Sequence, residues 1–101
     1  MGRAARARPR RLPQKLLRIR EALGVSCKVM VKKLKIEMPE DNMPKIYPQN
    51  VSGYESGKRE PALLTLLAYA RLAGVSVETL IDDKLDLPDR LPRRKKIGSR
   101  K

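Results

Sequence analysis

Residue types on which many enzymes and metalloproteins depend are absent or nearly absent from this chain of 101 residues. Histidine, the commonest general base and a common metal ligand, does not occur. The single cysteine, Cys27, cannot form an intramolecular disulfide or a cysteine-rich zinc site. A packing role for Cys27 is the simpler interpretation, although its place beside Lys28 at a predicted helix start also suits a redox switch. We therefore expect no cofactor, metal or catalytic residue, and predict that the protein is not an enzyme.

Phenylalanine and tryptophan are absent too, and three tyrosines supply the whole aromatic content of 3%. Aliphatic side chains must then form most of the core, and recognition of nucleic acid by aromatic base stacking has little support. No apolar run approaches the roughly 18 residues of a membrane span, and no apolar segment of a secretory signal follows the N-terminal arginines. We expect no membrane association and a cytoplasmic, nucleoid-associated location. An arginine-rich organellar transit peptide stays open as an alternative.

Positive charge is abundant and lies at the two ends of the chain. The sequence has 24 Lys and Arg against 11 Asp and Glu, a formal net charge of +13. Residues 1–11 and 90–101 hold twelve of the cations and no acid, so residues 12–89 are close to neutral. Ends this basic and this poor in apolar residues do not fold alone, and nucleic acid is their natural partner.

This distribution divides the chain into a basic N-terminal arm at 1–11, a folded domain at 12–85 and a proline-containing basic C-terminal tail at 86–101. One interpretation is that both ends are disordered, solvated segments that attach to any anionic surface. The sharper one is that the arm lies along phosphates or in a minor groove, where arginine is attracted by a negative potential. The basic arm carries Arg3, Arg6, Arg8, Arg10 and Arg11.

Apolar residues recur at spacings of three and four in five segments, most of them bounded by Pro, Ser or Gly. This pattern predicts an all-α domain with helices near 13–23, 26–34, 48–56, 61–73 and 76–81. In the last two helices, Leu63, Leu66, Leu67, Ala70, Val77, Leu80 and Ile81 are expected to face inward.

Two features follow the fifth predicted helix. Leu85, Leu87 and Leu91 are candidates for a dimer contact, or alternatively for a strap packed over the first and fifth helices. The acidic residues around them, Asp82, Asp83, Asp86 and Asp89, lack calcium-ligand spacing, and we interpret them as solvated surface.

The most informative segment is VSGYESGKREP at 51–61. Its apolar residues Val51 and Tyr54 share one helix face, because they are three positions apart. Small polar and amide side chains occupy the other faces, and such groups reach base edges in a major groove. Lys58 and Arg59 then follow, and both suit phosphates.

The run from Val51 to Asp83 resembles the second half of the Cro and phage-repressor type helix-turn-helix domain, and residues 16–34 resemble the first two helices of that family. The resemblance implies a compact five-helix repressor-type domain that regulates transcription by placing its third helix, about 48–56, in the major groove of double-stranded DNA, commonly as a homodimer. The base contacts that it implies are Gln49, Asn50, Ser52 and Gly53. The implied phosphate contacts are Ser26, Lys28, Ser56, Lys58 and Arg59.

The sequence departs from the family pattern in three places. Residues 35–46 put twelve residues where a turn of about three or four is usual, although part of them suits an extension of the second helix. Because they hold Glu37, Glu40 and Asp41, we expect this loop to point away from DNA. Cys27 stands where many relatives have a glutamine. Gly53 implies either close approach of the backbone to DNA or a smaller number of bases read.

Two other classes of function stay open. The basic ends alone would make the chain a non-specific nucleic-acid-binding protein. Alternatively, the helical domain is a protein-interaction module of the antitoxin or adaptor type, since a fold does not fix a function.

Overall fold

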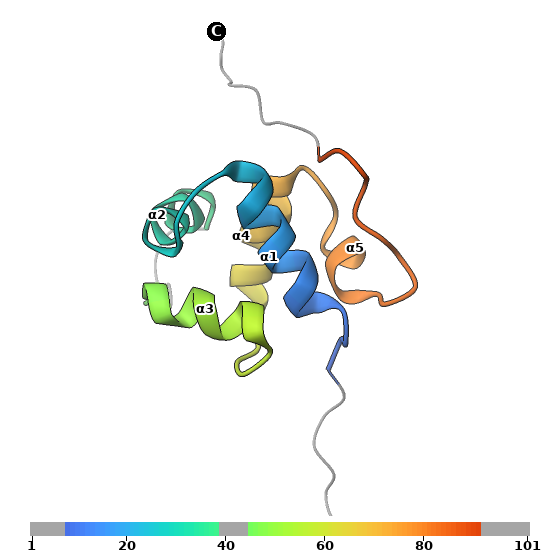
Figure 1. Ribbon diagram of the computed structural model, residues 1–101, viewed down its shortest axis with the longest axis horizontal. Coiled ribbons are helices and arrows are strands. Elements are labelled where there is room, and N and C mark those ends of the chain that lie inside the picture. The colour runs from blue at the N-terminus through green and yellow to red at the C-terminus, as the bar shows by residue number, and fades with distance from the viewer. Residues whose placement is uncertain (1–7, 39–44, 92–101) are drawn as a thin grey trace, which may run out of the picture.

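The computed structural model describes residues 8–38 and 45–91, and within these ranges it contains five helices and no strand. The helices are α1 (Leu12–Leu23), α2 (Cys27–Glu37), α3 (Pro48–Ser56), α4 (Leu63–Ala73) and α5 (Val77–Ile81), as Figure 1 shows. The all-α prediction is confirmed. The predicted disorder of the two ends concerns mainly residues outside the described ranges. Arg3 and Arg6 also lie outside them.

Short-range signals set the helix ends. Ser26 precedes α2 and its Oγ accepts the Val29 backbone N–H at 3.2 Å, while Ser76 precedes α5 and accepts the Thr79 N–H at 3.1 Å. Gly24 follows α1 in the left-handed conformation, with φ of 71°, and glycines end α3 and α4 in the same way. These caps satisfy backbone groups that the helices leave unpaired.

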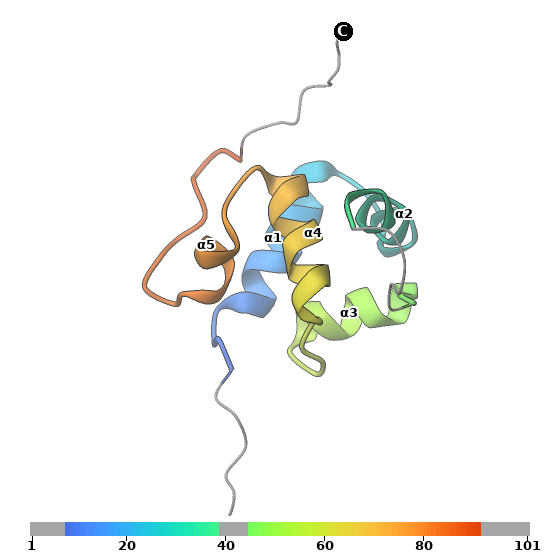
Figure 2. The same cartoon turned by 180° about the vertical axis from the view of Figure 1, so that it is seen from behind.

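Helices α1 and α4 lie side by side at the centre, with α2 and α3 on one flank and α5 on the other (Figures 1 and 2). The core joins residues from all five helices. Its largest fully buried side chains are Tyr69, Leu16, Ile19, Met30, Leu34, Leu80, Val51 and Thr65. Arg71 of α4 also donates to the Glu37 carbonyl at 3.0 Å and so ties α4 to the end of α2.

Two expected inward residues are exposed. Leu63 is 73% exposed at the first position of α4, because the inner face of this helix runs through Leu66, Tyr69 and Ala73. Ile81 is 41% exposed at the last position of α5, where Leu80 fills the core instead. The inward prediction was wrong for both residues.

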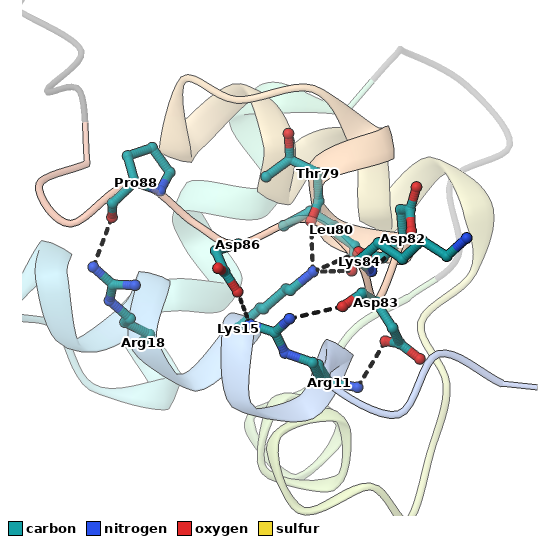
Figure 3. Close-up of polar contacts among 10 residues, drawn as sticks. All are labelled: Arg11, Lys15, Arg18, Thr79, Leu80, Asp82, Asp83, Lys84, Asp86 and Pro88. Carbon is teal, nitrogen blue, oxygen red and sulfur yellow. Dashed lines mark hydrogen bonds and ion pairs between the residues drawn. The ribbon is translucent and has the colours of Figure 1, made fainter.

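The segment after α5 packs back onto the domain as a strap. Leu87 is 5% exposed, and Leu91 packs against the core, whereas Leu85 is exposed. Arg18 of α1 holds the strap by donating to the Pro88 carbonyl at 2.6 Å (Figure 3) and to the Asp89 carbonyl at 2.8 Å. The packed region therefore continues beyond residue 85, and Leu87 is not available for a dimer contact.

Asp83 does not behave as solvated surface. Its carboxylate accepts the backbone N–H groups of Arg10 and Arg11 at 2.9 and 3.0 Å, at the entry to α1. Arg11 also donates to the Asp83 carbonyl and pairs with Asp86 (Figure 3). Buried Lys15 makes the return contact, since its Nζ donates to the Thr79 and Asp82 carbonyls at 2.7 and 3.0 Å at the end of α5. α1 and α5 thus cap each other.

Candidate nucleic-acid interface

Helix α3 is held by its inner face and leaves its outer face open. Val51 and Tyr54 are buried against the other helices, and Ile46 anchors the chain just before α3 begins. α3 packs on both α1 and α2. In Figure 1, α2 is seen nearly end-on and α3 runs across the view beneath it. The helix therefore has a fixed position with one face toward solvent.

Three exposed polar side chains form a row along that face, which we call the outer stripe: Gln49, Ser52 and Ser56. Their spacings of three and four place them on one side of α3. Lys45, which sequence reasoning missed, is exposed in the segment just before α3. Ser56 bonds within α3, because its Oγ donates to the Gly53 carbonyl at 3.2 Å. Gln49 and Ser52 have side chains suited to base edges.

Asn50 has a structural task at the start of α3. Its Oδ1 accepts the Tyr47 backbone N–H at 2.8 Å, which satisfies a group ahead of the helix. Bidentate recognition of adenine uses both the oxygen and the nitrogen of an amide side chain. The bond to the Tyr47 N–H uses one of the two lone pairs of Oδ1 and holds the side chain toward the start of α3, so Asn50 is a weaker candidate for that contact than Gln49.

Gly53 is covered by Arg59. A Cβ placed on Gly53 would lie 3.1 Å from Arg59 Cδ and 3.2 Å from Arg59 Cγ. The Lys58 and Arg59 backbone N–H groups also donate to the Gly53 carbonyl, at 3.0 and 3.1 Å. Gly53 therefore makes room for the returning α3–α4 loop and for the stem of Arg59, which accounts for a glycine here without close approach to DNA.

An ion pair between Arg20 and Glu55, which sequence reasoning missed, fixes α3 against α1. Arg20 donates from Nε and Nη2 to the Glu55 carboxylate at 2.7 and 3.1 Å, and from Nη1 to the Val25 carbonyl at 2.9 Å. The two side chains are only 21% and 9% exposed. The bond to Glu55 raises the pKa of Arg20 above its usual value. One guanidinium thus links α3 to the turn that precedes α2.

The predicted phosphate-binding residues divide into exposed and engaged groups. Lys28 is exposed in the first turn of α2, where the helix dipole adds positive potential. Lys58 and Arg59 are exposed after α3. Ser26 is exposed, but its Oγ caps α2.

In the basic arm, Arg8 and Arg10 are exposed, whereas Arg11 is half-buried. Its guanidinium is held by Asp86 and by the Asp83 carbonyl. We therefore leave Arg11 out of the interface.

In the described part of the chain, no group of three or more acidic, histidine or cysteine side chains is placed to hold a metal ion. Nor do residues 8–38 and 45–91 include a helix with the length and apolar character needed to cross a membrane. Comparison with protein-family models, curated proteins and solved structures yields no match.

Proposed function

We propose that this protein is a sequence-specific DNA-binding transcriptional regulator of the helix-turn-helix type, which inserts α3 into the major groove. The observation that carries the proposal is the outer stripe on a helix whose inner face is fixed by the core and by the Arg20–Glu55 pair. Base recognition depends on side chains presented in a fixed geometry. We also propose a cytoplasmic location at the nucleoid, where a regulator of this type would meet its DNA.

Within this proposal, the roles of the residues follow from their surroundings. Gln49 and Ser52 contact base edges. Lys28, Lys58 and Arg59 contact phosphates, with Ser26 donating its hydroxyl hydrogen, and exposed Lys45 adds positive charge just before α3. Asn50 holds the start of α3, and Gly53 supports Arg59 without meeting a base. The arginines of the arm other than Arg11 add affinity that does not depend on sequence.

The DNA-bound form that we propose is a homodimer. Two copies related by a two-fold axis place their third helices about 34 Å apart, one turn of DNA, and read an inverted repeat. Residues 12–91 form a small domain, and one short helix reads few bases, so a second copy raises specificity. The long α2–α3 connection is compatible with this arrangement if it lies away from the groove; residues 39–44 are outside the described ranges.

Fluorescence anisotropy with labelled duplexes tests the proposal directly. Gln49→Ala should weaken binding to the preferred duplex by about tenfold, because one good amide contact is worth about 1 to 3 kcal/mol. It should leave binding to unrelated duplexes nearly unchanged. Gln14→Ala is the matched control, since Gln14 is exposed on α1 and is not part of the outer stripe. Equal losses on both kinds of duplex would refute base reading by α3.

The arm is tested through the salt dependence of binding. A variant lacking residues 1–8 loses Arg3, Arg6 and Arg8. If each neutralises one phosphate, the slope of log affinity against log salt should fall by roughly 3, with site preference kept. An unchanged slope would show that the arm does not contact DNA phosphates.

A further inference from the structure

A hollow of about 290 Å³ opens between the base of the basic arm and the α3–α4 loop. We call it the arginine hollow. The segments that supply most of its lining, residues 8–13 and the α3–α4 loop, lie at one end of the domain (Figures 1 and 2). Three arginines, from two segments far apart in sequence, line it together with one carboxylate. Its lining consists of Arg8, Pro9, Arg10, Leu12, Pro13, Tyr54, Gly57, Arg59 and Glu60.

Contacts elsewhere in the fold hold two of these arginines in place. Asp83 binds the Arg10 backbone N–H, which sets where the arm leaves α1. The stem of Arg59 lies against Gly53, and its backbone N–H bonds to the Gly53 carbonyl. Folding therefore brings these arginines together before a ligand binds, so binding needs less ordering of the site.

The guanidinium groups of the arginine hollow are available to a ligand. Within residues 8–38 and 45–91, no carboxylate forms an ion pair with Arg8, Arg10 or Arg59. This contrasts with Arg11 and Arg20, which are paired with Asp86 and Glu55. Three guanidiniums outnumber the carboxylate of Glu60, so the hollow has a positive potential. An anion is the ligand that this charge attracts.

The apolar part of the lining narrows the class of anion. Leu12, Pro13 and the ring of Tyr54 supply carbon surface beneath the arginines. Burial raises the pKa of Tyr54 and the positive charge of Arg59 opposes that rise, which is consistent with a guanidinium near the phenol. The volume is close to the lower limit of small-molecule sites, about 300 Å³. A compact ligand with one strongly charged group and a small organic part fits this description.

We propose that the arginine hollow binds a phosphate ester, whose oxygens accept hydrogen bonds from Arg59 and Arg10 while its organic part rests on the Tyr54 side. Guanidinium groups match phosphate geometry and can bond it through two nitrogens at once. The ester is either a backbone phosphate of bound DNA or a free mononucleotide. The inference goes beyond the proposed function, because a free phosphate ester would occupy the hollow whether or not the chain binds DNA.

Nuclear magnetic resonance titration of the full-length protein tests the site, with inorganic phosphate and AMP as the probes. The backbone N–H of Gly57 and the Nε–H groups of Arg10 and Arg59 should shift and saturate. Arg18 and Arg20 serve as internal references, since strap carbonyls hold the first and Glu55 the second. Shifts that grow without saturation, or that are equal at all exposed cations, would overturn the proposal.

A pair of charge-matched variants separates the site from the general basicity of the chain. Arg59→Gln should weaken AMP binding by about tenfold, as expected for loss of one charge-assisted contact. Arg90→Gln removes the same charge from an exposed position outside the hollow and should change it less than about twofold. Equal effects of the two variants would also overturn the proposal.

Competition with duplex DNA identifies the source of the ester. If a duplex abolishes the AMP shifts, a backbone phosphate of DNA fills the hollow. If the shifts persist, the hollow binds a free phosphate ester alone. Both results support a phosphate site. Duplex binding is measured separately. AMP binding without duplex binding would refute only the proposed function, and duplex binding without saturable AMP or phosphate shifts would refute only this inference.

Discussion

Arg11 and Asp83 are 72 positions apart in sequence, yet the Arg11 backbone N–H donates to Asp83 Oδ1 at 3.0 Å. The other carboxylate oxygen takes the Arg10 N–H. Asp83 therefore satisfies backbone donors at the start of α1, where Arg11 itself offers no side-chain cap. The relationship joins the N-terminal arm, α1 and α5 into one unit, and it determines where the arm leaves the domain.

This contact predicts how stability depends on acidity. The backbone bonds of Arg11 and Arg10 hold the pKa of Asp83 below its ordinary value of 3.8. A carboxylate with a lowered folded pKa contributes stability that is present above pH 3.8 and is lost as the pH falls through the folded pKa. Asp83→Asn should therefore lower the free energy of unfolding at neutral pH and reduce the further loss on acidification. Urea unfolding between about pH 6 and pH 3 measures this.

Asp89→Asn is the control for that series, since only the backbone carbonyl of Asp89 takes part in a hydrogen bond among the described residues. It should keep the acid dependence of the unmodified protein. Identical curves for Asp83→Asn and the unmodified protein would show that the cap at α1 does not contribute to stability.

The Arg20–Glu55 pair should contribute both to stability and to the position of α3. Glu55→Gln keeps the size of the side chain but leaves Arg20 largely buried without its counter-charge. We expect a loss of about 2 to 3 kcal/mol in the free energy of unfolding, together with weaker DNA binding at temperatures where the variant is folded. Glu21→Gln, on an exposed site of α1, should change stability by less than about 0.5 kcal/mol. Equal effects of the two changes would contradict this role.

Gly53→Ala tests whether Gly53 positions the Arg59 side chain, separately from its effect on the stability of α3. Alanine favours a helix over glycine by about 0.5 to 1 kcal/mol, and here that gain is offset by displacement of the Arg59 stem. The free energy of unfolding should stay within about 0.5 kcal/mol of the original value, while binding to DNA and to AMP weakens.

Gly57→Ala provides the contrast to that variant. Gly57 has φ of 84°, which strains any other residue, so this change should destabilise the protein by about 1 kcal/mol. If Gly53→Ala left both binding reactions unchanged, the contact between Gly53 and Arg59 would have no part in positioning the guanidinium.

Replacement of Tyr69 by phenylalanine should stabilise the protein. Its ring is fully buried and meets Tyr54 edge to face, with centroids 6.5 Å apart, but its hydroxyl has no partner among the described residues. Tyr69→Phe keeps the ring contact and removes the unpaired group, so the melting temperature should rise, by an amount equivalent to about 1 kcal/mol. A fall instead would show that the hydroxyl is bonded in solution, for example to a buried water.

The sequence predicted the features of the fold that depend on residues close together in the chain. Ser26 before α2, Pro48 at the start of α3 and the glycines after three helices act within a few positions, so helix type and most helix ends followed from spacing. Leu63 was misplaced because the buried face of α4 is centred on Leu66, Tyr69 and Ala73, which the leucine spacing alone did not indicate.

The residues that shape the candidate interface were harder to foresee. Lys15 with Thr79 and Arg20 with Glu55 meet only after the helices have packed, and no periodicity links positions 64 or 35 residues apart. Gly53 was correctly placed on the outer side of α3, but the return of Arg59 over it depends on the course of the α3–α4 loop. Asn50 belonged to a polar face in the sequence, and only the Tyr47 N–H shows that its oxygen is already used.

Selection of binding sites from a random duplex library by the purified full-length protein, at near-physiological salt, tests the central claim that α3 reads DNA. We predict enrichment of one inverted repeat with half-sites about ten base pairs apart. In a parallel selection, Gln49→Ala should relax the preference at one position of each half-site, and Gln14→Ala should not. Tight binding without any enriched motif would contradict the account, because the basic ends would then carry the affinity and the outer stripe would read no sequence.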